Sequence, residues 1–492
     1  MATGIAPEGA HSFLHFLPAL TRWAYSNAAL RAVNRNLKLE TRNVKQNLKL
    51  ETRNSKPPSP ARAAAFDILM RVEQGAFADE LLHSDRLKNL SPQDRALTTE
   101  LVMGVLRWRS RLDRWLSQAS SQRLEKLDPE VLAALRLGAY QLAYLERVPA
   151  SAAVNESVEL MKWARRRFSA PFVNAVLRKL ANVPQPVAPG TAPAALAQNY
   201  AHPQWLVERW VQQYGADRGE RICAYNQQIP RTALRGVTAA VEQQLMAEGV
   251  RLQPGELLRS ARLVVDGEVT KSRAYREGRV WIQDEASQLV ALLVGNGSRL
   301  LDCCAAPGGK TAAMAERNPN SLIVAADFHP ARAQLLRRRL GTRNVHVISA
   351  RAEALPLSSE FDRILADVPC SGTGTLARNP EIKWRLKPED LADLHARQVA
   401  ILRGALSQLA PGGRLVYSTC SLEPEENEQV IEKVLSGNLR LVHCREVLEA
   451  LQNNGTLIWS DLGSLTCGPF LRTLPGVHPC DGFFAAVIER AD

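Results

Sequence analysis

The chain has 492 residues, 46% of them hydrophobic and 23% charged, and a formal net charge of +12. These values are typical of a globular protein with two to four domains of roughly 100–200 residues, and the positive charge favours an anionic partner such as nucleic acid. Eight cysteines without any Cys-x-x-Cys spacing exclude a disulfide scaffold and give no zinc signature, and no apolar run reaches the ~18 residues of a membrane helix.

We therefore expect a cytoplasmic protein whose cysteines remain thiols, with no metal and no membrane attachment. The first 57 residues form a basic leader with nine Lys or Arg and three acidic residues, which supplies +6 of the net charge. It repeats NLKLETRN at 36–43 and 47–54, and two copies are too few for a solenoid, which needs about three. We expect this leader to be disordered, the product of a start-site error or a local duplication.

Residues 58–183 have a helical pattern throughout and predict an all-α bundle. The segment LDPEVLAALRLGAYQLAYLE is an example, with Pro129 in the first turn of the predicted helix. Two clusters combine Arg with Trp, RWRSRLDRW at 107–115 and KWARRRF at 162–168. Each cluster could grip RNA phosphates and stack on bases, or could be a solvated helix face with Trp packed beneath it.

A proline-rich linker at 182–193 leads to a small mixed α+β domain at 199–275. From residue 276 to the end, short apolar runs alternate with helical segments. This alternation predicts an α/β catalytic domain with a parallel sheet and helices on both of its faces.

The first strand and helix of this α/β domain are joined by the loop CAAPGGK. Gly308 and Gly309 allow the backbone to approach a ligand at the helix N-terminus. A phosphate-binding P-loop would need glycine where Cys304 stands, and the G-x-G-x-x-G fingerprint is absent. Asp327 ends the next strand, near the offset at which an acid binds ribose hydroxyls, so an adenosine-type ligand fits.

Two cysteines occupy matched settings further along. Cys370 lies in ADVPCSGTGTLARNP and Cys420 in RLVYSTCSLEPEENE, each just after a predicted strand. Asp302 and Asp327 also follow strands, and the carboxyl ends of parallel strands share one edge of a sheet. With the strands before Cys370 and Cys420 as neighbours, both thiols would face one pocket.

These motifs resemble the signature motifs of the RNA cytosine-C5 methyltransferases. WIQDEASQLVALL at 281–293 and HPCDGFFAAVIER at 478–490 are similar to their flanking motifs, and the helical domain resembles the NusB-like domain of the bacterial Sun/Fmu branch. The resemblance covers about residues 58–492. It implies a Rossmann-like, S-adenosylmethionine-dependent methyltransferase sheet and small-subunit (16S) ribosomal RNA as the substrate.

The resemblance also assigns roles to individual residues. Cys420 is the nucleophile that attacks carbon 6 of cytosine, and Cys370 assists product release. Asp367 would hydrogen-bond the ring at N3, and Lys310 would either lower a thiol pKa or hold the Asp367 carboxylate. The expected cofactor-binding residues are Cys304, Ala305, Ala306, Pro307, Gly308, Gly309, Lys310, Asp327 and Asp367.

One departure concerns the end of the third strand, where this family usually has an acid near the adenine. Here the chain has Ser349, Ala350 and Arg351, and Glu353 or a backbone amide could substitute. For the RNA, Arg378, Lys383, Trp384 and Arg385 are expected to contact phosphates or bases, with Trp384 packing in the sheet's flank as the alternative for that residue.

Three other functions remain open from the sequence. They are the same reaction on transfer RNA, a non-catalytic RNA-binding assembly factor, and a thiol redox protein, which the lack of Cys-x-x-Cys disfavours. We expect a monomeric enzyme.

Overall fold

The computed structural model describes residues 57–341, 344–358 and 360–491. These residues form two compact units, which we call the helical unit (57–228 and 376–385) and the sheet unit (229–375 and 386–491). The expected leader and its repeat lie outside the described residues, except for Pro57.

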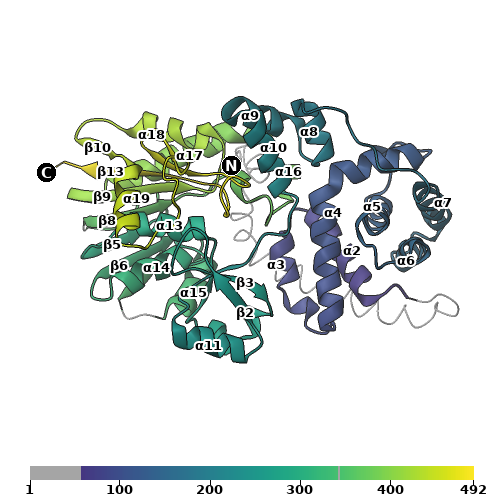
Figure 1. Ribbon diagram of the computed structural model, residues 1–492, viewed down its shortest axis with the longest axis horizontal. Coiled ribbons are helices and arrows are strands. Elements are labelled where there is room, and N and C mark those ends of the chain that lie inside the picture. The colour runs from purple at the N-terminus through teal and green to yellow at the C-terminus, as the bar shows by residue number, and fades with distance from the viewer. Residues whose placement is uncertain (1–56, 342–343, 359, 492) are drawn as a thin grey trace, which may run out of the picture. The chain divides into compact units, whose positions relative to one another are not determined.

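The helical unit is built around one central helix. Helix α5 is buried on nearly all sides, because α2, α4, α6 and α7 pack around it (Figure 1). Its short residues Ala133, Ala134 and Gly138 leave room for these neighbours. The helices of this unit are α2 (Pro60–Glu73), α3 (Ala78–Leu82), α4 (Pro92–Ala119), α5 (Pro129–Tyr144), α6 (Ala150–Trp163), α7 (Ala170–Leu180), α8 (Pro193–Asn199), α9 (Gln204–Tyr214), α10 (Ala216–Tyr225) and α16 (Ile382–Arg385).

The sheet unit begins with a small antiparallel sheet in the order β2-β3-β1-β4. Helices α11 (Ala239–Ala247) and α12 (Arg273–Arg276) share a core with it, centred on Leu234 and Leu245. The sequence analysis expects a small domain at 199–275. In the structure this sheet continues past residue 275 through β4, and the helices α8, α9 and α10 belong to the helical unit. Its strands are β1 (Ala233–Arg235), β2 (Arg251–Pro254), β3 (Arg262–Asp266) and β4 (Trp281–Ile282).

The large sheet has the order β11-β12-β13-β9-β8-β5-β6-β7, and β10 pairs with β13. The part of this order from β9 to β7 is a parallel sheet, in which β9, β8, β5, β6 and β7 run in the same direction. Strand β13 runs antiparallel to β9. The strands are β5 (Arg299–Asp302), β6 (Leu322–Asp327), β7 (Val345–Ser349), β8 (Phe361–Asp367), β9 (Leu409–Thr419), β10 (Leu439–Val442), β11 (Thr466–Cys467), β12 (Phe470–Thr473) and β13 (Phe483–Arg490).

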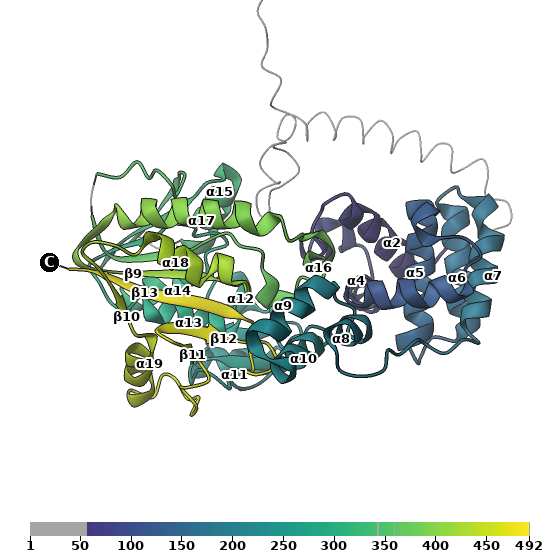
Figure 2. The same cartoon turned by 90° about the horizontal axis from the view of Figure 1, so that it is seen from above.

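Helices cover both faces of this sheet. Alternate residues of β13 enter different cores: Phe483 and Ala485 pack with α13 and α19, and Phe484 and Ala486 pack with α17 and α18. Figure 2 shows α17 and α18 on one side of β9 and β13, and α13 and α19 on the other. The helices are α13 (Glu285–Leu293), α14 (Gly309–Arg317), α15 (Pro330–Leu340), α17 (Asp390–Leu406), α18 (Glu428–Val434) and α19 (Cys444–Asn453).

The predicted fold class, an α/β sheet preceded by an all-α bundle and a small α+β domain, is confirmed. From β5 the chain builds outward through β6 and β7 and then crosses back to β8 on the other side of β5. This reversal of strand order is the place where open α/β sheets bind ligands, at the carboxyl ends of the strands.

Candidate active site

The two predicted cysteines lie together at this edge of the sheet. Cys370 follows β8 and Cys420 follows β9, and these strands pair in parallel, as expected. Their Sγ atoms are 3.3 Å apart, which is hydrogen-bond distance and well beyond the ~2.05 Å of a disulfide bond. Both residues are half-buried free thiols. Hydrogen bonding to Cys420, together with burial, holds the pKa of the Cys370 thiol well above its usual value.

The backbone fixes the Cys370 loop against its neighbours. The Gly374 N–H donates to the Cys420 carbonyl at 2.9 Å, and the Gly482 N–H donates to the Gly374 carbonyl at 2.8 Å. A Cβ atom on Gly374 would lie 2.2 Å from the Gly482 carbonyl oxygen, so only glycine fits. The flanking motif HPCDGFF thus helps to shape the loop that carries Cys370.

A buried carboxylate, Glu426, ties the two cysteine loops together. Its Oε1 accepts hydrogen bonds from the Ser371 N–H at 2.8 Å and from Gln398 Nε2 at 2.9 Å. Its Oε2 accepts from the hydroxyls of Ser371 and Ser421, the residues that follow Cys370 and Cys420. Burial raises the pKa of Glu426. The sequence analysis did not identify this residue, although it stands in the PEENE motif.

A cation and a carboxylate face each other beside the thiols. Lys310 Nζ lies 2.7 Å from Asp367 Oδ2, and the Ser418 hydroxyl donates to Asp367 Oδ1 at 2.7 Å. Lys310 also lies over the Phe483 ring, 4.9 Å from its centroid. We expected Lys310 either to lower a thiol pKa or to hold the Asp367 carboxylate, and the structure shows the contact with the carboxylate.

The glycine loop enters α14 as the sequence predicts. Gly308 has a φ of 108° and is the N-cap of α14, a conformation that favours glycine. The other expected cofactor-binding residues lie on this loop or at neighbouring strand ends. Ala305 is buried, Cys304, Ala306, Gly309 and Lys310 are half-buried, and Pro307 is exposed.

Beneath this loop lies a buried acid with a free oxygen. Asp302 ends β5 and is 1% exposed; its Oδ2 accepts from the Thr311 hydroxyl at 2.7 Å. Its Oδ1 has no hydrogen-bond partner among the residues that the structure describes. Burial raises the pKa of Asp302 to about 7. Sequence analysis placed Asp302 at this edge but gave it no role.

The end of β6 combines polar and aromatic groups. Asp327 Oδ1 accepts from the His329 N–H at 2.9 Å, so one oxygen of the expected ribose-binding acid caps the following turn. His329 is buried, and neither of its ring nitrogens has a partner within the described part of the chain. At the end of β7, where the chain lacks the usual acid, the Arg351 guanidinium carbon lies 5.6 Å from the centroid of the Phe328 ring. Its Nη2 lies 3.7 Å from Glu353 Oε1.

These residues fit an adenosine-bearing cofactor. The described chain leaves buried polar atoms without partners on Asp302 and His329, and both residues stand at or just past strand ends beside the glycine loop. Unpaired buried polar groups are rare in native proteins and are commonly satisfied by water or ligand. By contrast, among residues 57–341, 344–358 and 360–491 no group of three His, Cys, Asp or Glu side chains is placed to hold a metal ion.

The expected RNA-contacting segment after Cys370 is folded into the helical unit. Lys383 is 1% exposed, and its Nζ donates to the carbonyls of Arg107 and Ala201 at 2.8 and 2.9 Å. Trp384 Nε1 donates to the Leu106 carbonyl at 2.6 Å. The prediction of a phosphate contact is therefore wrong for Lys383, because a buried amine on backbone carbonyls cannot reach a phosphate.

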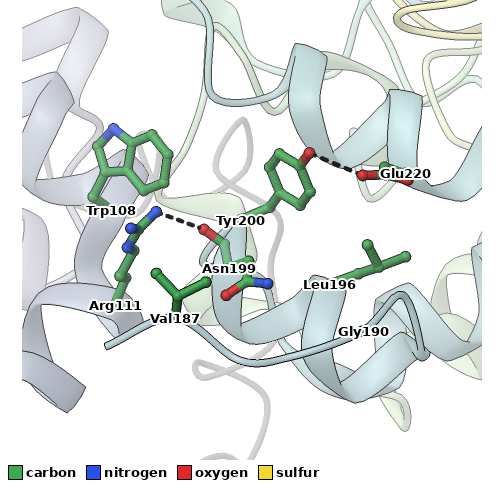
Figure 3. A pocket seen from close by; sticks show the side chains of 8 residues that line it. All are labelled: Trp108, Arg111, Val187, Gly190, Leu196, Asn199, Tyr200 and Glu220. Carbon is green, nitrogen blue, oxygen red and sulfur yellow. Dashed lines mark hydrogen bonds between the residues drawn. The ribbon is translucent and has the colours of Figure 1, made fainter. Parts of the chain in front are cut away.

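The 107–115 cluster is likewise used within the helical unit. Arg107 Nη2 donates to the Ala377 carbonyl at 3.1 Å, and Trp115 Nε1 donates to the Val183 carbonyl at 2.9 Å. Arg111 lies over the Trp108 ring and donates to the Asn199 carbonyl at 3.1 Å (Figure 3). Trp115 is packed, as the second alternative expected, but Arg107 is buried and is not part of a solvated helix face.

A cavity of about 260 Å³ opens beside this cluster. Figure 3 shows Trp108 and Arg111 on one side and the Tyr200 hydroxyl bonded to Glu220 on the other, at 3.1 Å. Its remaining lining residues are Val187, Gly190, Leu196 and Asn199, so all of the lining belongs to the helical unit.

None of the helices that the structure describes is long and apolar enough to cross a bilayer.

Family comparison matches three parts of the chain. The 16S rRNA methyltransferase RsmB/F family matches residues 289–489, the NusB family residues 59–182, and the ferredoxin-like domain of RsmF/B-like methyltransferases residues 202–269.

Individual relatives cover most of the chain. The probable ribosomal RNA small subunit methyltransferase B of Bacillus subtilis is 37% identical over 388 residues, which span 75% of this chain and 87% of that protein. A protein of the same name in Synechocystis is 34% identical over 454 residues, 88% of this chain and 99% of its own length. The crystal structure of PH0851 shares the fold with a TM-score of 0.73 at 24% identity, covering 89% of this chain and 100% of that one.

Proposed function

Because the chain belongs to the RsmB/F family of small-subunit ribosomal RNA methyltransferases, we propose that it methylates carbon 5 of a cytosine in 16S rRNA through a transient bond from Cys420 to carbon 6. The single observation that carries this proposal is the 3.3 Å separation of Cys370 and Cys420 beside the Lys310–Asp367 pair. Carbon 5 of cytosine is a poor nucleophile, and a thiolate that adds to carbon 6 makes it an enamine carbon.

S-adenosylmethionine is the cofactor, and when bound it supplies a methyl group on a positively charged sulfur. We assign its contacts to the loop from Cys304 to Lys310 and to Asp327, with Asp367 at the side of the target base. Asp302 and His329, whose buried polar atoms lack partners in the described chain, extend this set beyond the residues that the motifs indicated.

The contact between the thiols lets either residue support the other. Their sulfur atoms are 3.3 Å apart, and either one could donate the hydrogen bond. An S–H directed at a sulfur stabilises negative charge there. We take the order of the roles from the family motifs: Cys420 attacks carbon 6, and Cys370 assists release.

The Cys420 thiolate adds to carbon 6, and carbon 5 then forms its bond to the methyl group as the bond between that methyl group and the cofactor's sulfur breaks, which leaves S-adenosylhomocysteine. A base takes the proton from carbon 5, the 5,6 double bond re-forms, and the bond from carbon 6 to the Cys420 sulfur breaks. We assign to Cys370 the assistance of this release, as the acceptor of that proton directly or through water. Asp367, whose two oxygens are held by Lys310 and Ser418, would accept a hydrogen bond from N3 of the ring once addition at carbon 6 makes N3 basic and it takes up a proton.

The product identifies the reaction. The purified full chain would be incubated with methyl-labelled S-adenosylmethionine and either 16S rRNA, assembling small subunits or transfer RNA, and the labelled nucleosides separated by mass spectrometry. We expect 5-methylcytidine in the ribosomal samples. Label on another atom or base refutes the chemistry, and label in transfer RNA alone refutes the substrate.

Two further expectations accompany this reaction. We propose that the enzyme acts as a monomer and in the cytoplasm, where ribosomal subunits are assembled. Light scattering of the purified chain that reports a dimer would contradict the first, and tagged protein found outside the cytoplasmic fraction would contradict the second.

A further inference from the structure

The second basic-aromatic cluster, KWARRRF at 162–168, differs from the first in its exposure. It forms the turn between α6 and α7, two helices that lie side by side in Figures 1 and 2. The Phe168 side chain is fully exposed, and Trp163 is 45% exposed. A large aromatic ring in open solvent adds nothing to the core, so the Phe168 ring is available to an external partner.

One arginine of the turn pairs with acids, whereas the other two present their guanidinium groups to solvent. Arg166 pairs with Glu130 at 3.1 Å and with Asp128 at 3.5 Å. Arg165 and Arg167 are exposed and have neither a salt bridge nor a side-chain hydrogen bond to another residue described in the structure. Because Arg166 takes up the contacts with the acids at the turn, Arg165 and Arg167 are available to an anion.

The backbone presents these groups in a fixed turn. The Arg166 N–H donates to the Met161 carbonyl at 2.8 Å, and the Ser169 N–H donates to the Arg166 carbonyl at 2.9 Å. Arg165 has a φ of 60°, which is uncommon for a residue other than glycine. Trp163 packs edge-on against Phe66 with ring centroids 6.1 Å apart, which anchors the turn from below.

The local charge favours a polyanion. Residues 160–182 contain six basic residues and no acidic one, and the basic residues are Lys162, Arg165, Arg166, Arg167, Arg178 and Lys179. Lys162 pairs with Glu159 at 2.6 Å, and Arg166 pairs with Glu130 and Asp128, so the other four supply the excess of positive charge. An exposed aromatic ring among exposed arginines is the combination with which proteins hold single-stranded nucleic acid, because bases stack on the ring while cations track the phosphates.

We propose that the 163–168 turn is a binding site for single-stranded ribosomal RNA, with a base stacked on Phe168 and phosphates at Arg165 and Arg167. The inference rests on the proposed rRNA substrate, since it names a second place where that RNA is held. The residues that perform the chemistry belong to the sheet unit, so the turn contributes affinity and not catalysis.

The test measures binding of the full chain to a fluorescein-labelled 12-nucleotide single strand copied from 16S rRNA, by fluorescence anisotropy. Phe168→Ala should weaken binding about tenfold, Phe168→Trp should restore it, and Phe168→Leu should not. Arg165→Ala/Arg167→Ala should reduce the salt-dependence slope by roughly 0.7 for each phosphate that the variant no longer binds. These residues are exposed, so thermal unfolding should not change.

The matched control is Arg147→Ala. Arg147 is exposed and precedes α6, whose 14 residues place it roughly 20 Å from the turn. It should bind RNA as the wild type does. Wild-type affinity of Phe168→Ala, or rescue by Phe168→Leu, would overturn the stacking site; the latter would indicate an apolar protein partner instead. The readout needs no methyl transfer, so a product other than 5-methylcytidine would refute the proposed chemistry and leave this result standing.

Discussion

The Sγ atom of Cys370 lies 3.3 Å from the Sγ atom of Cys420, although fifty positions separate the two residues in the chain. The pairing of β8 with β9 brings both loops to the same edge of the sheet, and Glu426 holds the serine that follows each cysteine. The proximity is therefore built into the fold by a strand pair and a buried carboxylate.

Removal of the nucleophile should abolish the reaction and leave binding intact. Cys420→Ala lacks the sulfur that we propose adds to carbon 6, so kcat should fall by at least about a thousandfold. Affinity for 16S rRNA should stay within about twofold of the wild type. Cys467→Ala is the control, because Cys467 is an exposed free thiol on β11. Full activity of Cys420→Ala would refute the assignment.

Loss of the Glu426 carboxylate should loosen both cysteine loops. In Glu426→Gln an amide NH₂ replaces one oxygen, and it cannot accept hydrogen bonds from the two serine hydroxyls. We expect kcat to fall about tenfold to a hundredfold and the free energy of unfolding to drop by about 1–3 kcal/mol. The exposed Glu432→Gln should change neither. Wild-type kcat in Glu426→Gln would show that the tie does not position the thiols.

Asp302 should make the stability of the cofactor-free protein depend on pH. Its folded pKa of about 7 lies above the ~3.9 of an unfolded aspartate, so the folded state retains a proton that the unfolded state loses. Stability is then fully present below pH ~4 and falls as the pH rises to about 7, by up to about 4 kcal/mol. Asp302→Asn removes this dependence of the stability on pH, because the amide does not titrate.

The comparison is made by thermal unfolding across pH. Asp302→Asn should match the wild type near pH 4 and unfold at a higher temperature than the wild type near pH 8. Equal unfolding temperatures at both pH values would contradict the raised pKa.

Lys383 should matter for folding of the helical unit and not for contact with RNA. Its amine satisfies two buried carbonyls, and Lys383→Met leaves both without a donor. We expect the free energy of unfolding to fall by about 1–3 kcal/mol, with a salt-dependence slope of RNA binding equal to that of the wild type. The exposed Lys387→Met should leave stability within about 0.5 kcal/mol. If the salt-dependence slope of RNA binding is smaller in Lys383→Met than in the wild type, Lys383 does contact a phosphate.

The parts predicted correctly from sequence depend on local regularities. Strand, loop and helix alternate along the chain, and parallel strands bring their carboxyl ends to one edge, so periodicity predicts that Cys370, Cys420 and Asp327 share that edge. That the two cysteine strands are neighbours was implied by the resemblance to methyltransferase sheets. Gly308 was predictable for a similar reason, because a tight strand-to-helix turn requires a positive φ.

The parts that sequence missed depend on contacts between distant segments. A Lys-Trp-Arg run has the same letters whether it meets RNA or backbone carbonyls, and the partners of Lys383 are 276 and 182 positions away. Glu426 lies in an acidic run that is equally compatible with a solvated surface. Glu423 in the same run is equally buried, and only the hydrogen bonds of Glu426 to Ser371 and Ser421 distinguish it.

The most direct test of the covalent mechanism uses Cys370→Ala, in which release is impaired while Cys420 remains. After incubation with 16S rRNA and S-adenosylmethionine, a denaturing gel and peptide mass spectrometry should reveal an RNA adduct on Cys420. The adduct should be missing from the Cys370→Ala/Cys420→Ala double variant. If RNA that the wild type methylates forms no adduct, or forms one on a different residue, the mechanism is wrong.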